Sequence, residues 1–544
     1  MASEEILRKT LKNADGKPFQ KYKGLQNNFV LEDFELIFDD IQNDRMGHTN
    51  MRVRVPLKKA GFPDDMHDTR ERDIALRDLI ARRFRESART HARSPIPKTS
   101  GGEVFIPRPG QEILERGSVV FSPYFVEVRF TADLPADGNK VSAVAMDLLI
   151  ERIRTIVSES LYMSAYKQSK VYNHIQVYEN AEFIRKNLKS KGLAAFIADG
   201  SILPRREDDL APMIDAKPFE CDQELKATFE VPNGDPITGL GIPEGFTVIT
   251  GSSRNGKSTL LDAIFAGVYD HIPGDGREYV ITSSDATYIV SEPDRPADSV
   301  DISMFVKDTT EFEDTSAAKR EFVSSPMSEF LAVSEAIEMG SDLLLVDEEY
   351  SNPSVIRKGF MADNESITSL SEIGHSMGKN GISMIMVSGD ESAIRAADNV
   401  IGFDGMKAVP IEVEKRQCEK EFRRPIDRSP VSKGMVFEKG HRDVNVNAQE
   451  IRTIEIGEFK VYVPVAAFFD ISQTNTVADV IAFMKDSMDG SKSMLEICRS
   501  AIESVKAEDD STDNGSGMHH AQVRPMDVAS VLNRHPQMLA IQKR

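Results

Sequence analysis

The sequence predicts an α/β core that is flanked by an α+β domain on its N-terminal side and by a small α+β region on its C-terminal side. Three observations support this fold class. Strand-like and helix-like patterns alternate over residues 216–410, which favours a mainly parallel sheet surrounded by helices. Residues 1–215 instead mix amphipathic helices with alternating, β-rich stretches. At residue 411 a polar connector begins, and strand and helix patterns return later within 411–544.

In the N-terminal domain, apolar residues at helical spacing predict three helices, over residues 70–88, 141–165 and 174–193. Between the first two, "SVVFSPYFVEVRF" at 118–130 alternates and is rich in β-forming residues, so it predicts strands. Residues 1–215 are therefore predicted to form an α+β domain of their own, separate from the core with alternating strands and helices.

In the core, strands are expected at "FTVIT", "DLLLVDEE" and "GISMIMVS", and helices after Lys257 and at "SEFLAVSEAIEMG". The C-terminal region is expected to hold a strand pair near "RTIEIGEFKVYV", helices near residues 476–506 and a closing helix in "RPMDVASVLNRHP". Between them, "AEDDSTDNGSGMHH" at 507–520 has the composition of a disordered loop.

Composition narrows the class of protein. The chain has 544 residues, three widely spaced cysteines and a net charge of −20, and none of its apolar runs approaches the roughly 18 residues that span a bilayer. Its first residues are charged and include no apolar signal segment. We therefore expect a cytoplasmic protein with no membrane association, in a reducing compartment.

One segment reverses the acidic balance. Residues 82–98 carry Arg82, Arg83, Arg85, Arg89, Arg93 and Lys98 against the single acid Glu86. Two interpretations fit this pattern: a solvated helix face that leads into a flexible loop, or an anion-binding surface that contacts RNA. Because the whole chain is acidic, any nucleic-acid site must be a local patch of this kind.

The residues with the clearest chemistry lie in "GSSRNGKS", residues 251–258, which fits the phosphate-loop pattern G-x-x-x-x-G-K-[ST]. A strand precedes this loop and a helix follows it, which is the context that the motif requires. Its backbone N–H groups and the helix N-terminus are suited to phosphate oxygens. Lys257 is predicted to reach the β- and γ-phosphates, and the Ser258 hydroxyl to bind Mg²⁺.

The stretch "DLLLVDEE", residues 342–349, supplies the second half of a P-loop NTPase site. Four apolar residues predict a buried strand that ends in two acids. Asp347 is expected to hold Mg²⁺ through water as the Walker B acid, and Glu348 to polarise the attacking water. This pair of acids is typical of P-loop enzymes that hydrolyse nucleotide.

These motifs, with several others, resemble the family called predicted ATPases of the ABC class. The matching stretches are "FDDIQNDRM", "DLPADGNK", "AFIADGSILPR", "GLGIPEGFTVITGSSRNGKSTLL", "GVYDHIPGDGRE", "EAIEMGSDLLLVDEE" and "RPMDVASVLNR". The resemblance implies an ATPase with an ABC-type core and family-specific additions at both ends. It also implies a homodimer with ATP bound at the interface, and a link to RNA has been suggested for some relatives.

The chain departs from the family pattern at five places. One is the run after Walker B, which in the family is rich in Thr, Ser and Asn and is shortened here to "YSNPSVIR", residues 350–357. Asn255 replaces a histidine before Gly-Lys-Ser, and the glycine-rich signature segment reads "VSSPMSE", residues 323–329, with Ser325 for a glycine and an added Pro326. In an ABC dimer this segment caps the γ-phosphate of the other subunit through backbone N–H groups, and proline removes one of them. After the strand "GISMIMV" no switch histidine is present, and Asp390 is the nearest polar candidate. At the Q-loop position, "SEPDR" keeps Glu292 and Arg295.

From these residues we expect Mg²⁺-dependent ATP hydrolysis at a dimer interface. The candidate residues are, for catalysis, Glu348 and Lys257; for ATP, Gly251, Ser252, Ser253, Arg254, Asn255, Gly256, Lys257, Ser258, Thr259, Ser324 and Ser325; and for the metal, Ser258 and Asp347. Three alternatives stay open: a nucleotide-gated RNA-binding module, an ATP-binding scaffold with little or no turnover, and another P-loop chemistry such as a small-molecule kinase.

Some family-matched residues have a structural interpretation beside the functional one. The turn "PGDGRE" after His271 fits helix termination or a contact near the nucleotide. Phe219 and Phe229 precede the P-loop and fit either adenine stacking or core packing, with core packing favoured.

Overall fold

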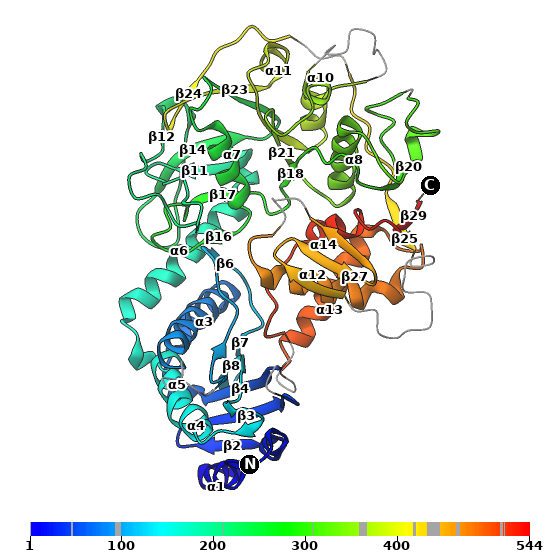
Figure 1. The fold of residues 1–544 in the computed structure, drawn as a ribbon. Coiled ribbons are helices and arrows are strands. Elements are labelled where there is room, and N and C mark those ends of the chain that lie inside the picture. The colour runs from blue at the N-terminus through cyan, green and yellow to red at the C-terminus, as the bar shows by residue number, and fades with distance from the viewer. Residues whose placement is uncertain are drawn as a thin grey trace. The chain divides into compact units, whose positions relative to one another are not determined.

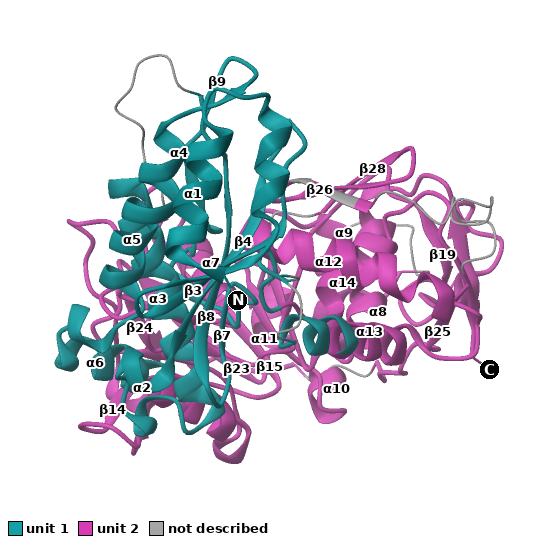
Figure 2. Ribbon diagram, turned by 90° about the horizontal axis from the view of Figure 1, so that it is seen from below, with its two compact units in different colours: residues 1–178, 504–522 teal, residues 179–503, 523–544 magenta. Residues whose placement is uncertain are grey.

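The computed structural model describes residues 2–543 except 45–46, 93–99, 209, 308, 358–366, 417–419, 432–445, 464–467, 512–514 and 516. The chain forms two compact units, which Figure 2 colours separately. Unit 1 contains residues 1–178 and 504–522, and unit 2 contains residues 179–503 and 523–544. The chain therefore leaves the first unit, builds the second and contributes a late segment back to the first.

Unit 1 is built on a seven-stranded sheet in the order β1-β2-β3-β4-β8-β5, with β7 also paired to β8. All pairings are antiparallel except that of β1 with β2. The strands are β1 (Ala2–Ser3), β2 (Asn28–Leu31), β3 (Phe34–Asp40), β4 (Thr49–Pro56), β5 (Val104–Phe105), β7 (Val119–Phe121) and β8 (Phe125–Ala132). The strands predicted over 118–130 are thus β7 and β8.

The two central strands of this sheet separate apolar from charged residues by strict alternation. In the β4–β8 register, Met51, Val53 and Val55 lie opposite Phe130, Val128 and Val126, and all six are fully buried. The residues between them on the other face are charged: Arg52 and Arg54 on β4, and Glu127 and Arg129 on β8. Alternation by two residues places each set on one face of the sheet.

Helices α3 (Arg70–His91) and α5 (Ile153–Ser160) pack against each other, and α3 also packs on β7. The helix predicted over 70–88 is α3. The helix predicted over 141–165 is shorter and irregular: α4 (Val144–Met146) leads into a π-helical stretch (Asp147–Arg152), then α5 ends at Ser160. The predicted helix over 174–193 corresponds to α6 (Gln168–Asn187).

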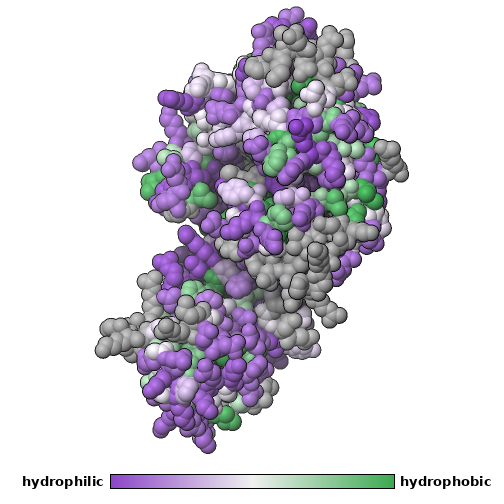
Figure 3. Space-filling view, turned by 45° about the vertical axis from the view of Figure 1, so that its right-hand side comes forward, coloured by the Kyte–Doolittle hydropathy of each residue, from purple (hydrophilic) through white to green (hydrophobic). Residues whose placement is uncertain are grey.

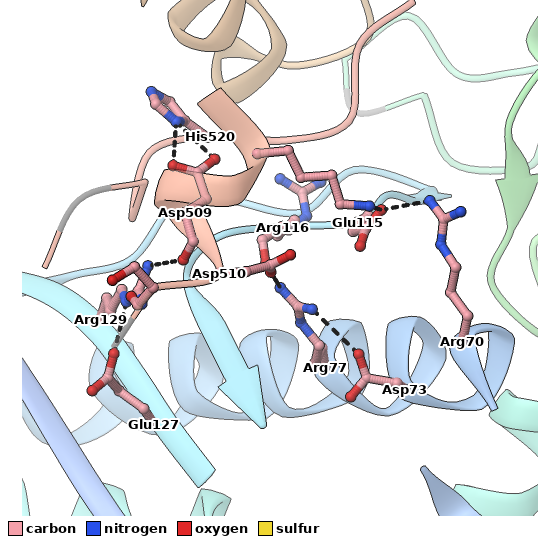
Figure 4. A network of polar contacts seen from close by, with 12 residues as sticks. Arg70, Asp73, Arg77, Glu115, Arg116, Glu127, Arg129, Asp509, Asp510 and His520 are labelled. Carbon is pink, nitrogen blue, oxygen red and sulfur yellow. Dashed lines mark hydrogen bonds and ion pairs between the residues drawn. The ribbon is translucent and has the colours of Figure 1, made fainter. Parts of the chain in front are cut away.

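The charged face of the β4–β8 pair is covered by the late segment of unit 1, residues 504–522 (Figure 4). Glu127 accepts hydrogen bonds from Arg54 Nε at 2.5 Å and from Arg129 Nε at 2.8 Å. The Arg129 guanidinium then donates to the carbonyl oxygens of Asp509 and Ser511, each at 2.5 Å. A buried arginine is tolerated when its donors are paired in this way. The late segment therefore supplies the acceptors that the buried Arg129 side chain requires.

Further contacts hold the same segment in unit 1. Lys506 Nζ donates to Glu115 Oε2 at 2.8 Å, and the His520 ring bonds the Asp509 carboxylate at 2.9 Å. The stretch predicted to be a disordered loop, 507–520, therefore contains ordered residues at both ends; residues 512–514 and 516 lie outside the described part. Gly117 approaches Gly517 so closely that a Cβ at Gly117 would lie well inside van der Waals contact of the Gly517 carbonyl oxygen.

Unit 2 is organised by a seven-stranded sheet in the order β12-β24-β23-β15-β22-β21-β18, whose neighbours are parallel except β23 with β24 (Figure 1). The strands are β12 (Glu220–Cys221), β15 (Phe246–Thr250), β18 (Thr287–Ile289), β21 (Leu343–Asp347), β22 (Ser383–Val387), β23 (Asn399–Asp404) and β24 (Lys407–Pro410). The sequence prediction of a mainly parallel sheet in an α/β core is confirmed. β21 and β22 are buried at every residue, as expected of strands covered on both faces.

The helices of this core are α7 (Lys257–Ala266), α8 (Ser325–Glu338), α10 (Leu370–Lys379) and α11 (Glu391–Ala396). An antiparallel four-stranded sheet belongs to the same unit, in the order β13 (Lys226–Phe229), β14 (Ile237–Pro243), β11 (Leu193–Ala198) and β17 (Val280–Thr282). The family-specific turn after β16 (Asp270–His271) lies between α7 and β17 in the chain.

The remainder of the chain in unit 2 adds a three-stranded antiparallel sheet and helices. The strands are β26 (Val446–Glu450), β27 (Thr453–Ile456) and β28 (Phe459–Tyr462), and the helices are α12 (Ile471–Met484), α13 (Met494–Asp509, which passes into unit 1) and α14 (Pro525–Leu532). The predicted strand pair and closing helix are present. A last strand, β29 (Leu539–Gln542), follows α14 and pairs with β25 (Arg428–Val431).

One face of the described surface is drawn in Figure 3 by the hydropathy of its residues. On the face drawn in Figure 3, hydrophilic residues predominate and hydrophobic residues form small separate groups. Within the described residues, every helix is too short or too polar to cross a lipid bilayer.

The contact between Gly117 and Gly517 gives a test of how the late segment is held. Gly117→Ala should destabilise the protein by about 2 kcal/mol, because the new methyl group overlaps a backbone carbonyl that cannot rotate away. Urea unfolding followed by circular dichroism measures the change. The matched control is Gly24→Ala, whose methyl group would meet only Thr10 Cγ2 at an ordinary 3.8 Å. Equal stability of the two variants would contradict the close approach.

Candidate functional site

The glycine-rich loop connects β15 to α7, as the sequence predicts. Two glycines are required by its shape. A Cβ at Gly251 would collide with the Phe403 carbonyl oxygen, and Gly256 has φ of +87°, where a Cβ would collide with the end of the Met406 side chain. Arg254 also adopts a left-handed conformation, with φ of +64°, which is uncommon for a residue with a side chain. The backbone is therefore bent tightly at the start of α7, where N–H groups at a helix terminus attract anions.

The side chains of the loop are accessible and lightly tethered. Residues 251–254 are exposed, and residues 255–259 are half-buried. Lys257 Nζ donates to the Ser252 carbonyl oxygen at 2.9 Å, which folds the lysine back over the loop. Asn255, which stands where the family has a histidine, donates from Nδ2 to Asp404 Oδ1 at 2.7 Å. Asp404 ends β23, so Asn255 ties the loop to the neighbouring strand.

Asp347, the predicted Walker B acid, is fully buried at the carboxyl end of β21. Its Oδ1 accepts a hydrogen bond from Glu349 N at 2.9 Å, whereas its Oδ2 has no hydrogen-bond partner among the described residues. A buried carboxylate oxygen without a donor is energetically costly unless a cation or water completes it. Carboxylate and hydroxyl oxygens, the groups that Asp347 and Ser258 carry, are hard ligands of the kind that Mg²⁺ prefers.

Glu348, the predicted general base, lies in a closed cycle of polar contacts that we call the Glu348 ring: Glu348, Ser388, Asp390 and Arg357. Glu348 Oε2 accepts from Ser388 Oγ and from Gly389 N, both at 2.8 Å, and Oε1 forms an ion pair with Arg357. Burial acts to raise the pKa of Glu348. The hydrogen bonds from Arg357, Gly389 and Ser388 outweigh it and hold that pKa below its ordinary value.

Sequence reasoning missed two residues beside these acids. Asp262 lies on α7, one helical turn after Ser258, and its pKa is raised to about 6 by burial and by Asp347, with Arg277 opposing the rise. The i, i+4 spacing from Ser258 was the available signal. Arg357 follows the short helix α9 (Pro353–Ile356), and nothing in its local sequence indicates that it returns to Glu348.

The signature segment, residues 323–329, lies in a different cluster from the P-loop, at the start of α8. Ser324 is exposed and donates from both N and Oγ to the Glu311 carboxylate at 2.6 Å. Ser325 Oγ contacts Ser291 Oγ at 2.7 Å and accepts from Asn352 Nδ2 at 3.0 Å. The structure therefore connects Ser325 to the Q-loop region and to the segment after Walker B within one chain, whereas Ser324 binds Glu311.

Pro326 does not interrupt α8. It occupies the first turn of the helix, where a backbone N–H has no intrahelical partner and proline is favoured. Ser328, one turn along, donates from Oγ to the Ser325 carbonyl oxygen at 2.7 Å and accepts from Glu292 N at 2.9 Å. The helix start is thus well formed, although the N–H that proline lacks is still absent.

The turn "PGDGRE", residues 273–278, is held in place by buried polar contacts. His271 Nδ1 contacts Asp275 Oδ2 at 2.8 Å, and Arg205 binds the same oxygen at 2.6 Å. Gly276 has φ of +81° and packs on Ile202, leaving no room for a Cβ. This favours the structural interpretation of the turn: it locks the stretch "ADGSILPR" against the segment that follows α7.

Two aromatic residues that could have stacked on adenine are in the core. Phe219 and Phe229 are 0% and 1% exposed, and they contact the rings of Phe403 and Phe196 respectively. Core packing, the favoured interpretation, accounts for both.

Most of the basic segment is committed to local structure. Arg82 donates to the Gly110 and Glu112 carbonyl oxygens at 2.6 and 2.8 Å, Arg83 donates to the Glu159 carbonyl oxygen at 3.0 Å, and Arg85 to that of Ile106 at 2.8 Å. Arg89 is exposed, while Arg93 and Lys98 lie outside the described residues. In the part of this segment that the structure describes, Arg82, Arg83 and Arg85 are therefore bound to backbone carbonyl oxygens. This favours a structural role for them over an open anion-binding surface.

Three family models match successive parts of the chain. A family model of the ABC ATPase P-loop domain matches residues 167–437, and a model described as the N-terminal part of ATPases of the ABC class matches residues 4–164. A third model, the MRB1590 C-terminal domain, matches residues 445–540.

Two individual proteins are also similar. The uncharacterized protein MJ1628 of Methanocaldococcus jannaschii is 31% identical over 205 residues, which are 36% of this chain and 46% of that protein. The match thus spans about half the length of that relative. A solved structure of the ATP-binding cassette MJ0796, in a dimeric post-hydrolysis state with ADP and phosphate, is 13% identical. It covers 35% of this chain and 97% of its own, with a TM-score of 0.22, too low to support any inference.

The parallel sheet, the glycine-rich loop and the acids at the end of β21 define a P-loop ATPase core of the ABC type. The additional N-terminal match extends this assignment beyond the core. The chain belongs to the family of ABC-class ATPases, as a divergent member.

The role of the basic segment can be tested through Arg82, which forms an ion pair with the fully buried Asp78 at 2.6 Å. Burial opposes ionisation of Asp78, but Arg82 and His174 lower its pKa to about 2. Arg82→Ala should therefore destabilise the protein by on the order of 2–3 kcal/mol, because a buried carboxylate loses its main partner. Urea unfolding measures this.

Arg89→Ala is the matched control, since Arg89 is exposed on the same helix and its loss should change stability by less than about 0.5 kcal/mol. Loss of single-stranded RNA affinity in Arg89→Ala at unchanged stability would instead support a nucleic-acid surface.

Proposed function

We propose that this protein binds and hydrolyses Mg²⁺-ATP, and that two copies of the chain form the complete site. The observation that carries the proposal is the arrangement of Asp347 and Glu348 at the end of β21. Asp347 presents a buried carboxylate oxygen with no donor among the described residues, and Glu348 is kept ionised next to it.

The division of labour follows from the positions of the side chains. The loop backbone and Lys257 would bind the β- and γ-phosphates, and Ser258 with Asp347 would hold the cation, Asp347 through water. Mg²⁺, when bound, neutralises phosphate charge and orients the terminal phosphoryl group. Glu348 has an oxygen with lone-pair capacity left to accept a proton from water, since Arg357 takes only one position on Oε1.

A second copy is supported by the family resemblance, in which ABC cores bind ATP between subunits, and by the surface around the signature segment. Ser324 is exposed at the start of α8. Phe322 and Tyr350, which flank the signature segment and the Walker B acids in the chain, are 59% and 56% exposed. Large apolar side chains next to a half-site are suited to burial against another protein surface.

Hydrolysis is tested by Glu348→Gln, which keeps the shape of the side chain and removes its basicity. The expected result is a fall in steady-state ATP turnover of at least about 100-fold, the range typical of a general base, with ATP affinity retained. Phosphate release measures turnover, and a fluorescent ATP analogue measures affinity.

Glu349→Gln is the control, because Glu349 is exposed and adjacent, yet contacts Asp347 only through its backbone N–H. It should keep turnover within a factor of about three of the unchanged protein. Equal turnover in the unchanged protein and in Glu348→Gln would indicate an ATP-binding protein without hydrolysis at this site.

The interface is tested by sedimentation velocity of Glu348→Gln with and without Mg²⁺-ATP. A shift from one to two copies is expected with nucleotide, and Phe322→Glu should weaken it at least about tenfold, since a charge at an apolar contact must be desolvated. Tyr462→Glu, at a site 63% exposed on β28, serves as the control. A single species that nucleotide does not change would overturn the dimer.

A further inference from the structure

The Glu348 ring contains a cation, Arg357, which does not come from the segment after β22, where the family pattern has a histidine. β22 is followed by Ser388, Gly389 and Asp390, and none of these carries a positive charge. Among the described residues that hydrogen-bond to the Glu348 side chain, the charged donor is Arg357. The arginine comes from the other side of the site, nine residues after Glu348 in the chain.

Each link of the ring is a separate contact. Ser388 Oγ donates to Glu348 Oε2 at 2.8 Å and accepts from Asp390 N at 3.0 Å. Asp390 Oδ2 lies 3.5 Å from Arg357 Nε, an ion pair without a hydrogen bond, and the Nη2 end of the guanidinium pairs with Glu348 Oε1. The cycle therefore closes on the residue from which it starts.

The ring is anchored at both ends by backbone structure. Asp390 is the N-cap of α11, where its Oδ1 accepts from Ser392 N at 2.9 Å. Arg357 N donates to the Pro353 carbonyl oxygen at 2.8 Å, which closes the α9 turn, and Asn352 caps the start of that turn. Asn352 also binds Ser325 of the signature segment. Two short helices thus hold the arginine and the aspartate of the ring, and the Glu348 side chain is fixed between Arg357 on one oxygen and Ser388 with Gly389 on the other.

Arg357 is also reachable from solvent, since its side chain is 37% exposed while that of Glu348 is 22% exposed. A guanidinium has five donors in a fixed plane, so one that already binds two carboxylates keeps others free to meet a further anion. Its position next to the predicted general base allows it to keep Glu348 in one rotamer and to add positive charge at the edge of the site.

We propose that Arg357 is the positioning residue for Glu348 and takes the place of the absent switch histidine. This inference rests on the proposed ATP hydrolysis. Arg357 holds Oε1, Ser388 and Gly389 hold Oε2, and the carboxylate is thereby aimed before the nucleotide binds. Orientation of a base by fixed partners contributes to rate without contributing to nucleotide affinity.

The first test compares Arg357→Ala with the unchanged protein. The kcat for ATP should fall by about 10- to 100-fold, while KM and the affinity for a non-hydrolysable ATP analogue change by less than about threefold. Arg357→Lys should restore part of the loss, because an ammonium can bind one carboxylate but cannot bridge two as the guanidinium does.

Arg395→Ala is the matched control, since Arg395 is a half-exposed arginine on the neighbouring α11 whose Nε binds Glu391 at 2.8 Å, outside the ring. It should leave kcat unchanged. If Arg357→Ala raised kcat, the arginine would be a restraint on Glu348 and the proposal would be overturned; an unchanged kcat would overturn it as well.

The second test asks whether Arg357 acts through Glu348. In single-turnover measurements with ATP in the Glu348→Gln background, adding Arg357→Ala should cost less than about threefold, because the group that it positions is already disabled. An equal loss in both backgrounds would mean a role elsewhere in the fold and would contradict the inference. Melting curves of each variant exclude unfolding as the cause, and Arg357→Lys repeats the cycle if Arg357→Ala does not fold.

The two proposals fail in different ways. If the unchanged protein turns over ATP no faster than Glu348→Gln, hydrolysis itself is absent. If turnover depends on Glu348 but not on Arg357, the proposed ATPase stands and only the positioning role is wrong.

Discussion

The parallel pairing of β15, β22 and β21 is the constraint on which the candidate site depends. Ile249 pairs with Val387, and Val387 pairs with Asp347, so three chain segments leave the sheet at one edge. The ladder continues one step beyond the strands, through Ser388 N to the Ile249 carbonyl oxygen at 3.1 Å and Glu348 N to that of Val387 at 3.0 Å. A slip of one residue would reverse the direction of every side chain here, and Asp347 would then face the opposite side of the sheet from the one that it faces now.

Buried charge pairs join the last part of the chain to this core. Arg428 is 2% exposed and donates to Glu338 of α8 at 2.8 Å and to Asn533 at 3.1 Å; burial raises the pKa of Glu338 to about 7, against the opposing effect of Arg428. Arg534 binds Glu292, whose N–H binds Ser328 in the signature segment. Removing one member of a buried pair leaves the other uncompensated. The residues after α14 are therefore part of the P-loop unit, and they connect the Q-loop position to the chain's C-terminal segment.

What the sequence could predict was local. The loop at 251–258 and the strand that ends in Asp347 each follow from a contiguous pattern, whereas the helix predicted from Ser328 begins earlier, at Ser325. The contacts of Arg129 with residues 509 and 511 bridge about 380 residues, and β29 pairs with a strand more than 100 residues earlier, so neither leaves a local trace. Residues 507–511 illustrate the difference: their polar composition predicts disorder, whereas the buried Arg129 donates to the carbonyl oxygens of Asp509 and Ser511. Arg357 was missed for the same reason. Its contacts with Glu348 and Asp390 arise only in the folded chain and leave no pattern in the local sequence.

The segments that depart from the family pattern make contacts of their own. Asn255 donates a hydrogen bond to Asp404, and Ser325 accepts one from Asn352. Pro326 occupies a position in the first turn of α8 that tolerates proline. Ser388, in the segment without a histidine, donates to Glu348. Other buried atoms of the same segments lack a hydrogen-bond partner among the described residues, among them Glu329 Oε2 of the signature segment and Arg357 Nε. The Asp347 oxygen without a donor is fully buried as well, and there it destabilises the protein unless a ligand completes it. This is the oxygen to which the proposed Mg²⁺ site assigns a role, so the cost of burying it follows from the proposed function.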